Sequence, residues 1–231
     1  GSGEYLLVAL EMKIDALSRH YKKIPLHMVH EAVRTIFGND INEESIAIAK
    51  IRILLCILRK VGAYAIDGLA NITNPNFYSY DYIVSETKGI TYDIIVGNPP
   101  YIRVQNMVHF SENEYEYYKS EFSEYETART DLLDKYFLFL EKGLTLLKAN
   151  GKMGYIIPHK FMLIKSGSSL RKMLSEMKCV KQIIHFGTEQ VFKGRSTYTC
   201  LLFVEKKERK SFEIGFVKDI NRFYATGAVD M

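Results

Sequence analysis

The chain has 231 residues, and 47% of them are hydrophobic, which is enough to bury the core of one globular domain or of two small ones. The net charge of +4 permits an anionic partner without requiring one. The sequence shows neither a secretory signal nor an apolar run long enough to cross a membrane, and its three cysteines lack the spacing of metal ligands. These features exclude disulfide-rich and membrane-spanning classes, so we expect a cytoplasmic protein with reduced cysteines and no bound metal.

The amino-terminal residues predict a glycine-rich turn followed by an amphipathic helix. Leu6, Leu10, Ile14 and Leu17 recur at helical spacing directly after Gly1–Gly3. A glycine-rich start lets a ligand approach the backbone and meet the positive end of the helix. The same three residues are also a common remnant of cloning, so the sequence alone leaves both interpretations open.

A strand is predicted at 34–38 and a second amphipathic helix at 43–60. Asp40 follows the predicted strand, where nucleotide-binding α/β folds hold ribose hydroxyls. Its carboxylate can accept both hydrogen bonds of a vicinal diol. The alternative is a turn or helix-capping role, for which Asn42 is the better candidate. We predict ribose binding by Asp40.

The segment 61–89 is rich in turn and aromatic residues and predicts little; Asp81 is an acidic residue there without a motif. The next run, 92–97, is apolar, β-branched and closed by glycine, which predicts a buried parallel strand. Whatever follows this strand lies at its carboxyl end, where open α/β sheets bind their ligands.

Asn98, Pro99, Pro100 and Tyr101 occupy that position. The Asn98 carboxamide can accept a hydrogen bond from an amino group, the prolines fix the backbone, and Tyr101 offers a flat face for stacking. Together they predict a rigid cup for a planar molecule with an exocyclic amine. The alternative, a Pro-Pro turn that only ends the strand, leaves the flanking Asn98 and Tyr101 unexplained.

The rest of the chain alternates helices and strands. The acidic, tyrosine-dense segment 112–126 predicts a surface helix rather than a phosphate contact. Further helices are predicted at 131–147 and 168–177, and strands at 152–157, 180–186 and 198–204. The last two strands are joined by a loop too short for a crossover helix, so we expect an antiparallel pair. The other elements form a βαβ series and hence a mostly parallel sheet.

The string from Asp93 to Arg103 resembles motif IV of the S-adenosylmethionine-dependent amino methyltransferases, above all the adenine-specific DNA methyltransferases of type II and IIG restriction–modification systems. The segments from Gly1 to about Lys207 are similar to that family in motif order. The resemblance implies an α/β, Rossmann-like class I methyltransferase fold with a mixed, mostly parallel sheet and an antiparallel carboxyl-terminal edge. It also implies that residues 1–231 are one catalytic domain, starting within motif I and lacking a target-recognition domain.

The resemblance implies three groups of site residues. Catalysis would fall to Asn98, Pro99, Pro100 and Tyr101, and stacking of the target base to Tyr101 and Phe192. The cofactor would contact Gly1, Ser2, Gly3, Glu4, Asp40, Ile41, Asn76, Phe77 and Phe139, with Asn76 at the motif III position that normally holds an aspartate. DNA would contact Arg103, Gln105, Lys160, Lys193 and Arg195. From the residues alone, Phe139 is more simply a core residue of its helix, whereas Phe192 is equally a hydrophobic anchor of its loop.

The implied reaction is methyl transfer from S-adenosylmethionine to the exocyclic amine of an adenine in DNA, which must first leave the duplex. Asn98 and the Pro99 carbonyl would accept the two amino hydrogens, and positioning would supply most of the rate. The implied partners are DNA with a flipped adenine and a target-recognition domain or specificity subunit outside this chain. Three alternatives stay open: methylation of RNA, methylation of a protein glutamine, and a non-catalytic DNA-binding or assembly domain.

Overall fold

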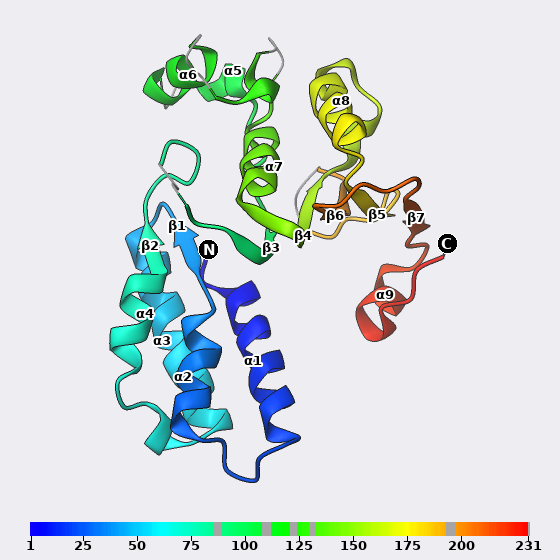
Figure 1. Cartoon of the computed structure of the whole chain (residues 1–231). Coiled ribbons are helices and arrows are strands. Elements are labelled where there is room, and N and C mark those ends of the chain that lie inside the picture. The colour runs from blue at the N-terminus through cyan, green and yellow to red at the C-terminus, as the bar shows by residue number, and fades with distance from the viewer. Residues whose placement is uncertain (86–88, 108–111, 121–123, 130–132, 193–196, 231) are drawn as a thin grey trace. The chain divides into compact units, whose positions relative to one another are not determined.

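The computed structural model describes residues 1–85, 89–107, 112–120, 124–129, 133–192 and 197–230. The chain divides into two compact units, Gly1–Glu86 and Thr87–Met231 (Figure 1). Within these ranges no helix combines the length and the apolar character that a bilayer span requires.

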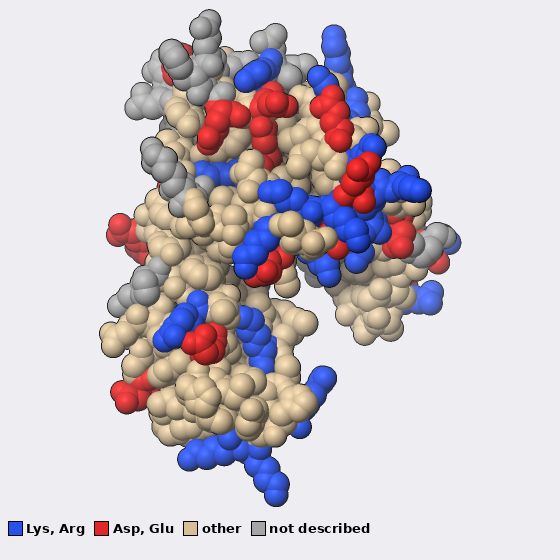
Figure 2. Space-filling model, in the orientation of Figure 1, with Lys and Arg blue, Asp and Glu red and all other residues tan. Residues whose placement is uncertain are grey.

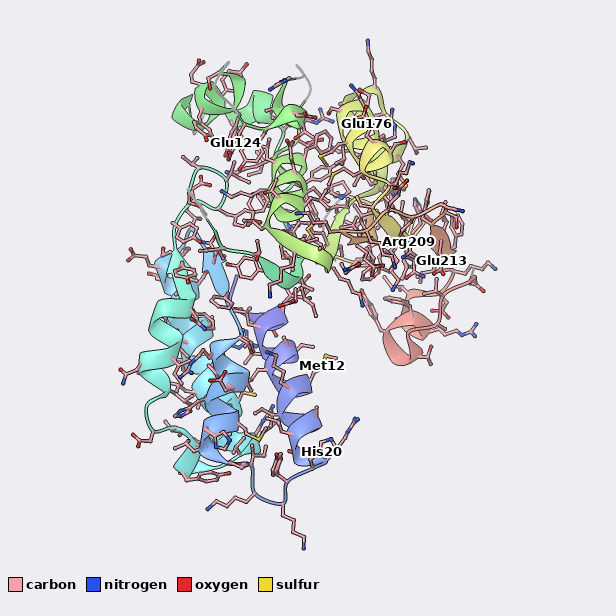
Figure 3. All side chains as sticks on the ribbon, in the orientation of Figure 1. Met12, His20, Glu124, Glu176, Arg209 and Glu213 are labelled. Carbon is pink, nitrogen blue, oxygen red and sulfur yellow. The ribbon has the colours of Figure 1, made fainter. Side chains whose placement is uncertain are left out.

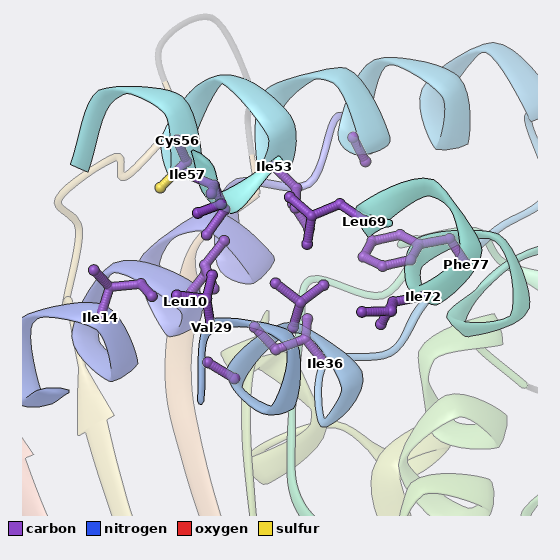
Figure 4. Packing of buried hydrophobic residues seen from close by; sticks show 14 of the residues in the cluster. Leu10, Ile14, Val29, Ile36, Ile53, Cys56, Ile57, Leu69, Ile72 and Phe77 are labelled. Atoms are coloured by element: carbon purple, nitrogen blue, oxygen red, sulfur yellow. The ribbon is translucent and has the colours of Figure 1, made fainter. Parts of the chain in front are cut away.

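Unit 1 consists of helices around a short parallel strand pair. Its helices are α1 (Glu4–Ser18), α2 (Leu26–Arg34), α3 (Glu43–Lys60) and α4 (Leu69–Asn76), with a 3-10 turn at Ala63–Ala65. Strand β1 (Gly38–Asp40) pairs in parallel with β2 (Phe77–Ser79). The helices bury one apolar cluster that includes Leu10, Val29, Ile53, Leu69 and Phe77 (Figure 4). The opposite side of α1 faces solvent, and Met12 there is 69% exposed (Figure 3).

Two expectations for unit 1 meet different outcomes. The helix 43–60 is confirmed, and Asn42 caps it by accepting hydrogen bonds from Glu44 N at 2.8 Å and Ser45 N at 3.2 Å. The strand predicted at 34–38 is wrong, because α2 continues to Arg34 and β1 begins only at Gly38. The reason is that α2 buries Val29, Ala32 and Val33 on one face, and this favours helix through its last turn.

Unit 2 is built on a five-stranded sheet in the order β3-β4-β6-β5-β7. Its strands are β3 (Tyr92–Gly97), β4 (Leu147–Pro158), β5 (Val180–His185), β6 (Thr199–Glu205) and β7 (Glu213–Phe216). The pairs β3–β4 and β5–β7 are parallel, whereas β6 runs antiparallel to both of its neighbours. The predicted antiparallel pair, β5 with β6, is therefore confirmed, although β7 and not β6 forms the outer edge.

The helices of unit 2 are α5 (Val104–Met107), α6 (Glu112–Lys119), α7 (Lys135–Leu146), α8 (Ser168–Met177) and α9 (Ile220–Thr226). In Figure 1, α7 and α8 stand on the same side of the strands. The predicted helix at 168–177 is confirmed. Helix α7 starts after Asp134, and the first residues predicted for it, 131–132, lie outside the described ranges. Two 3-10 turns, His159–Met162 and Lys165–Gly167, link β4 to α8.

Strand β3 is parallel, as predicted, but it is not buried. Among the described residues it pairs with β4 alone and forms one edge of the sheet. Ile94 is 68% exposed and Val96 is 46% exposed. The expectation of a buried strand is wrong because an apolar run does not reveal whether both faces of a strand are covered.

Candidate active site

The tetrapeptide Asn98–Tyr101 follows β3 directly, at the carboxyl edge of the sheet. Asn98 is exposed and Pro99 is buried, so the carboxamide is open to a ligand while its backbone is fixed. The Tyr101 hydroxyl lies 2.5 Å from Asn98 Oδ1 and 2.9 Å from the Ile156 carbonyl oxygen on β4. Because a hydroxyl has a single hydrogen to donate, the Tyr101 hydroxyl can donate at any moment either to the Asn98 carboxamide or to the Ile156 carbonyl on β4. The predicted cup is thus anchored to the sheet.

A cleft of about 510 Å³ opens beside Tyr101. This volume is in the range of small-molecule sites. Its walls include Arg103, Asp134, His159, Lys160 and Tyr198. Backbone pairing explains part of this convergence, because Arg103 forms an antiparallel bridge with Asp134, and Lys135 N donates to the Ile102 carbonyl at 2.8 Å.

Another wall of the cleft comes from Thr197 and Tyr198, the two residues that directly precede the antiparallel strand β6. Because β6 is antiparallel to β4, its first residue Thr199 pairs with the last residue of β4, Pro158. Tyr198 therefore meets His159, and their rings stack at 5.9 Å with an angle of 8° between planes. Asp134, His159 and Tyr198 were absent from the predicted site, and only the pairing of distant strands brings them to it.

Aromatic contacts also fix Tyr101. Tyr136, on α7, is fully buried and meets the Tyr101 ring edge-on, with centroids 6.2 Å apart. Burial raises the pKa of Tyr136, and the nearby Asp134 carboxylate adds to the rise. Its hydroxyl has no hydrogen-bond partner within the described part of the chain. Tyr136 therefore acts as an apolar support for the ring of the cup.

The His159 ring, which stacks on Tyr198, also stacks on the ring of His185. His159 and His185 lie 4.4 Å apart at 23°. Burial lowers the pKa of both rings, and the charge of His185 lowers that of His159 further. In addition, His185 Nδ1 accepts a hydrogen bond from Gly187 N at 2.7 Å, which requires an unprotonated nitrogen.

These depressed pKa values predict that the protein loses stability in mild acid. Below the ordinary histidine pKa of 6.5, these histidines are protonated in the unfolded chain but still neutral in the folded chain. The free energy of unfolding therefore decreases as the pH decreases, until the folded rings also become protonated. We expect the urea midpoint to fall between pH 7 and pH 5, and to fall less in His185→Phe, which keeps a stacking ring. Equal slopes in the two proteins would contradict this assignment.

In unit 1 the predicted cofactor residues gather at the carboxyl end of β1. The Gly1 amino group contacts Asp40, whose Oδ1 also accepts from Asn42 N at 2.8 Å. Gly3 has a φ of +84°, and a Cβ there would lie 2.9 Å from Ala49 Cβ. Ser2 and Glu4 both contact the Arg52 guanidinium, at 3.0 Å and 2.6 Å. Ile41, next to Asp40, is exposed.

Asn76 and Phe77 are placed elsewhere. Asn76 precedes β2 and is buried, and its Nδ2 donates to the carbonyls of Arg34 at 2.7 Å and Ile36 at 3.1 Å. Phe77 is buried in the apolar cluster of unit 1. Both residues lie at the amino end of β2, whereas Asp40 pairs with Ser79 at its carboxyl end. The acidic residue just past that end is Asp81, which the sequence reading left without a motif.

The remaining predicted residues scatter more widely. Arg103 and Lys160 line the cleft, while Phe192 is half-buried and is not among the lining residues that the structure describes. Phe139 is half-buried on α7 in unit 2. Lys193, Arg195 and the side chain of Gln105 lie outside the described residues.

The surface charge of unit 2 is mixed. Figure 2 shows Lys and Arg side chains over the strands of this unit, with Asp and Glu among them. Several of these cations are paired: Lys148 with Asp93 at 2.8 Å, Lys178 with Glu208 at 2.6 Å, and Arg209 with Glu205 at 2.8 Å. This face is therefore not a uniform phosphate-binding surface, and the cleft remains the best-defined site.

The fold is that of the class I S-adenosylmethionine-dependent methyltransferases. A protein from Listeria monocytogenes classified with them superposes with a TM-score of 0.57 at 14% identity, over 89% of this chain and 59% of that one. The ATP-dependent Type ISP restriction-modification enzyme LlaBIII, solved bound to DNA, superposes with a TM-score of 0.61 at 17% identity, over 94% of this chain and 17% of that one.

The chain belongs to the Eco57I restriction-modification methylase family, whose pattern matches residues 34–192. Its relatives include RM.Eco57I of Escherichia coli, a type II restriction enzyme and methyltransferase, which is 42% identical over 132 residues. That alignment covers 57% of this chain but 13% of RM.Eco57I, so the chain corresponds to a small part of its relative.

Proposed function

We propose that the chain carries the catalytic site of an enzyme that transfers a methyl group from S-adenosylmethionine to the exocyclic amine of adenine in DNA, within a restriction–modification system. The main support is the exposed Asn98 carboxamide, which is hydrogen-bonded to Tyr101 beside a cleft. The chain also belongs to a family of restriction-modification methylases. RM.Eco57I is named as a restriction enzyme and methyltransferase, and LlaBIII was solved on DNA. These relatives support DNA as the substrate.

The residues of unit 1 fit the cofactor. The backbone of Gly1–Glu4 approaches the start of a 15-residue helix, and Asp40 offers a carboxylate beside it for the ribose hydroxyls. We infer that Asp81, rather than the buried Asn76, accepts a hydrogen bond from the cofactor's adenine amine, and that Phe77 supports the loop from the core. We infer that Ile41 and Phe139 are the cofactor's apolar contacts. When bound, S-adenosylmethionine would supply an electrophilic methyl group, whose bond to the sulfonium sulfur breaks to leave a neutral thioether.

The residues of the cup prepare the nucleophile. The amino nitrogen of adenine is weakly nucleophilic because its lone pair is delocalised into the ring. Asn98 Oδ1 and the Pro99 carbonyl accept its two hydrogens and draw the lone pair out of conjugation, while Pro100 keeps the backbone rigid. Tyr101 stacks the extruded base, with Phe192 as its second aromatic contact. Arg103, Gln105, Lys160, Lys193 and Arg195 contact the DNA, and sequence recognition falls to another domain or subunit.

The test offers labelled S-adenosylmethionine to the full-length protein with genomic DNA, ribosomal RNA or a release factor in separate reactions. Label in DNA, recovered as methyladenine after digestion, supports the proposal. Label in methylcytosine would move the target base, and label in RNA or protein would overturn the DNA substrate. A protein that labels none of them would be non-catalytic.

Variants of Tyr101 separate stacking from positioning. Tyr101→Ala removes the ring and is expected to weaken binding to DNA with a flipped base by about 1–3 kcal/mol. Tyr101→Phe keeps the ring but frees the Asn98 carboxamide, so we expect near-normal DNA binding with slower transfer. Fluorescence of 2-aminopurine at the target position measures binding, and single-turnover labelling measures transfer. Equal behaviour of both variants would contradict the division of roles.

A further inference from the structure

An ion pair between a buried carboxylate and a partly exposed ammonium forms part of the cleft that opens beside Tyr101. Lys160 Nζ lies 3.0 Å from Asp134 Oδ2 and 3.4 Å from Oδ1, and both residues line the cleft. The side chain of Asp134 is 5% exposed, whereas that of Lys160 is 32% exposed. The carboxylate is thus enclosed by protein, and the ammonium faces the open space.

Stability alone does not explain such a pair. Removing the Asp134 carboxylate from water has a cost that its attraction to the partly exposed Lys160 ammonium largely offsets, so a well-packed apolar residue would serve the fold about equally well. The surroundings are suited to apolar packing, because Tyr136 and Leu133 next to Asp134 are buried. The pair therefore has a use at the cleft.

Counting donors indicates what that use is. A lysine ammonium carries three hydrogens and no acceptor. The Asp134 carboxylate occupies at most two of them, through Oδ1 and Oδ2. Within the described part of the chain, at least one hydrogen of Lys160 remains for a ligand. Its direction is constrained because the backbone of Asp134 is held by the bridge to Arg103.

Charge selects the kind of acceptor. Together Asp134 and Lys160 are neutral, and a buried carboxylate 3.0 Å from the ammonium repels an approaching phosphate. An uncharged acceptor meets no such penalty. Once the amino group of adenine is held by Asn98 and Pro99, the acceptors left on the base are its ring nitrogens N1, N3 and N7.

We propose that Lys160, oriented by Asp134, donates a hydrogen bond to a ring nitrogen of the extruded adenine and so selects the target base. This inference rests on the proposed function. It assigns Lys160 a base contact rather than a contact with the DNA backbone, and makes Asp134 a positioning residue.

The contact is tested by removing a ring nitrogen from the target adenine and, separately, the ammonium group from Lys160. A duplex that the full-length wild-type protein methylates is prepared with 1-deaza-, 3-deaza- or 7-deazaadenine at the target. One analogue should slow wild-type single-turnover transfer about 10- to 100-fold, as expected for loss of a hydrogen bond to a charged donor. Lys160→Met should be slowed by a similar factor on adenine, and the analogue should slow this variant about 10- to 100-fold less than it slows the wild-type protein. Intrinsic effects of the analogue on the amine cancel in this comparison.

Two further variants control for nonspecific loss of a lysine and for poor folding of Lys160→Met. Lys165→Met removes an exposed lysine of the next 3-10 turn, and should keep the full wild-type analogue penalty. The double variant Asp134→Asn/Lys160→Met leaves no unpaired buried charge, and should behave as Lys160→Met if that single variant folds poorly.

The inference is overturned if no analogue slows the wild-type protein, or if Lys160→Met and the double variant retain the penalty. Wild-type protein that methylates adenine normally while failing this test refutes only the base contact. Wild-type protein that methylates no adenine in DNA refutes the proposed function, and the inference with it.

Discussion

Replacing Asn98 with alanine is expected to slow methyl transfer by about 1,000-fold or more while S-adenosylmethionine binding stays unchanged. In the proposed mechanism the Asn98 carboxamide accepts a hydrogen bond from the adenine amine as methyl transfer begins. Its loss should therefore weaken stabilisation of the transition state and leave cofactor binding unchanged. The fold should survive, because Asn98 is exposed and Tyr101 keeps its second acceptor, the Ile156 carbonyl at 2.9 Å.

Single-turnover labelling of DNA measures the rate, and calorimetric titration with S-adenosylmethionine measures cofactor affinity. Asn221→Ala is the matched control, since Asn221 is an exposed asparagine on α9 away from the cleft-lining residues. Transfer by Asn98→Ala at a rate within a few-fold of wild type would refute the catalytic role. Loss of cofactor binding together with transfer would point instead to a structural role.

Replacing Gly167 with alanine is expected to destabilise unit 2 by about 3 kcal/mol or more. A Cβ at this position would lie 2.1 Å from the Phe161 carbonyl oxygen and 2.7 Å from its carbonyl carbon, and these are backbone atoms that cannot rotate away. The turn His159–Met162 would have to move, and it carries both His159 and Lys160. The variant should therefore also lose transfer activity.

Gly187→Ala is the control, because this glycine has a positive φ but no close neighbour, whereas Gly167 has close neighbours but no positive φ. Gly187 has a φ of +59°, but nothing lies within 4 Å of a Cβ built there. Its replacement incurs only the left-handed backbone penalty, roughly 1–2 kcal/mol. Urea unfolding followed by circular dichroism compares the two. A Gly167→Ala protein as stable as Gly187→Ala would show that the two 3-10 turns are not packed as described.

The sequence was most informative where structure is decided locally. The cap and periodicity of 43–60 predict that helix, the helix at 168–177 is likewise found, and the run 92–97 closed by glycine and prolines places Asn98 at a strand end. In each case the signal lies within a few residues of the feature. The antiparallel pairing of β5 with β6 also followed from a local quantity, the length of the loop between them.

Prediction failed where pairing over long distances decides the outcome. Asn76 matches a motif position, but the register of β2 against β1 puts it at the amino end and leaves Asp81 at the carboxyl end. The cleft partners Asp134 and Tyr198 carry no local signal, because each is brought there by a segment far away in the chain. The strand predicted at 34–38 is wrong because Arg34 still belongs to α2 and the apolar residues after it, Ile36 and Phe37, lie in the connection to β1.

The inverted direction of β6 also bears on how such enzymes diversify. The connection from His185 to Thr199 begins and ends on the sheet but delivers its last residue, Tyr198, to the cleft. Lengthening a surface loop is inexpensive, about 0.6 kcal/mol for each doubling of its length. Insertions in this connection can therefore alter what touches the substrate while Asn98, on a different strand connection, keeps its geometry. Under the proposed function, the segment that can change to bind another substrate and the segment that carries Asn98 are thus separate parts of the chain.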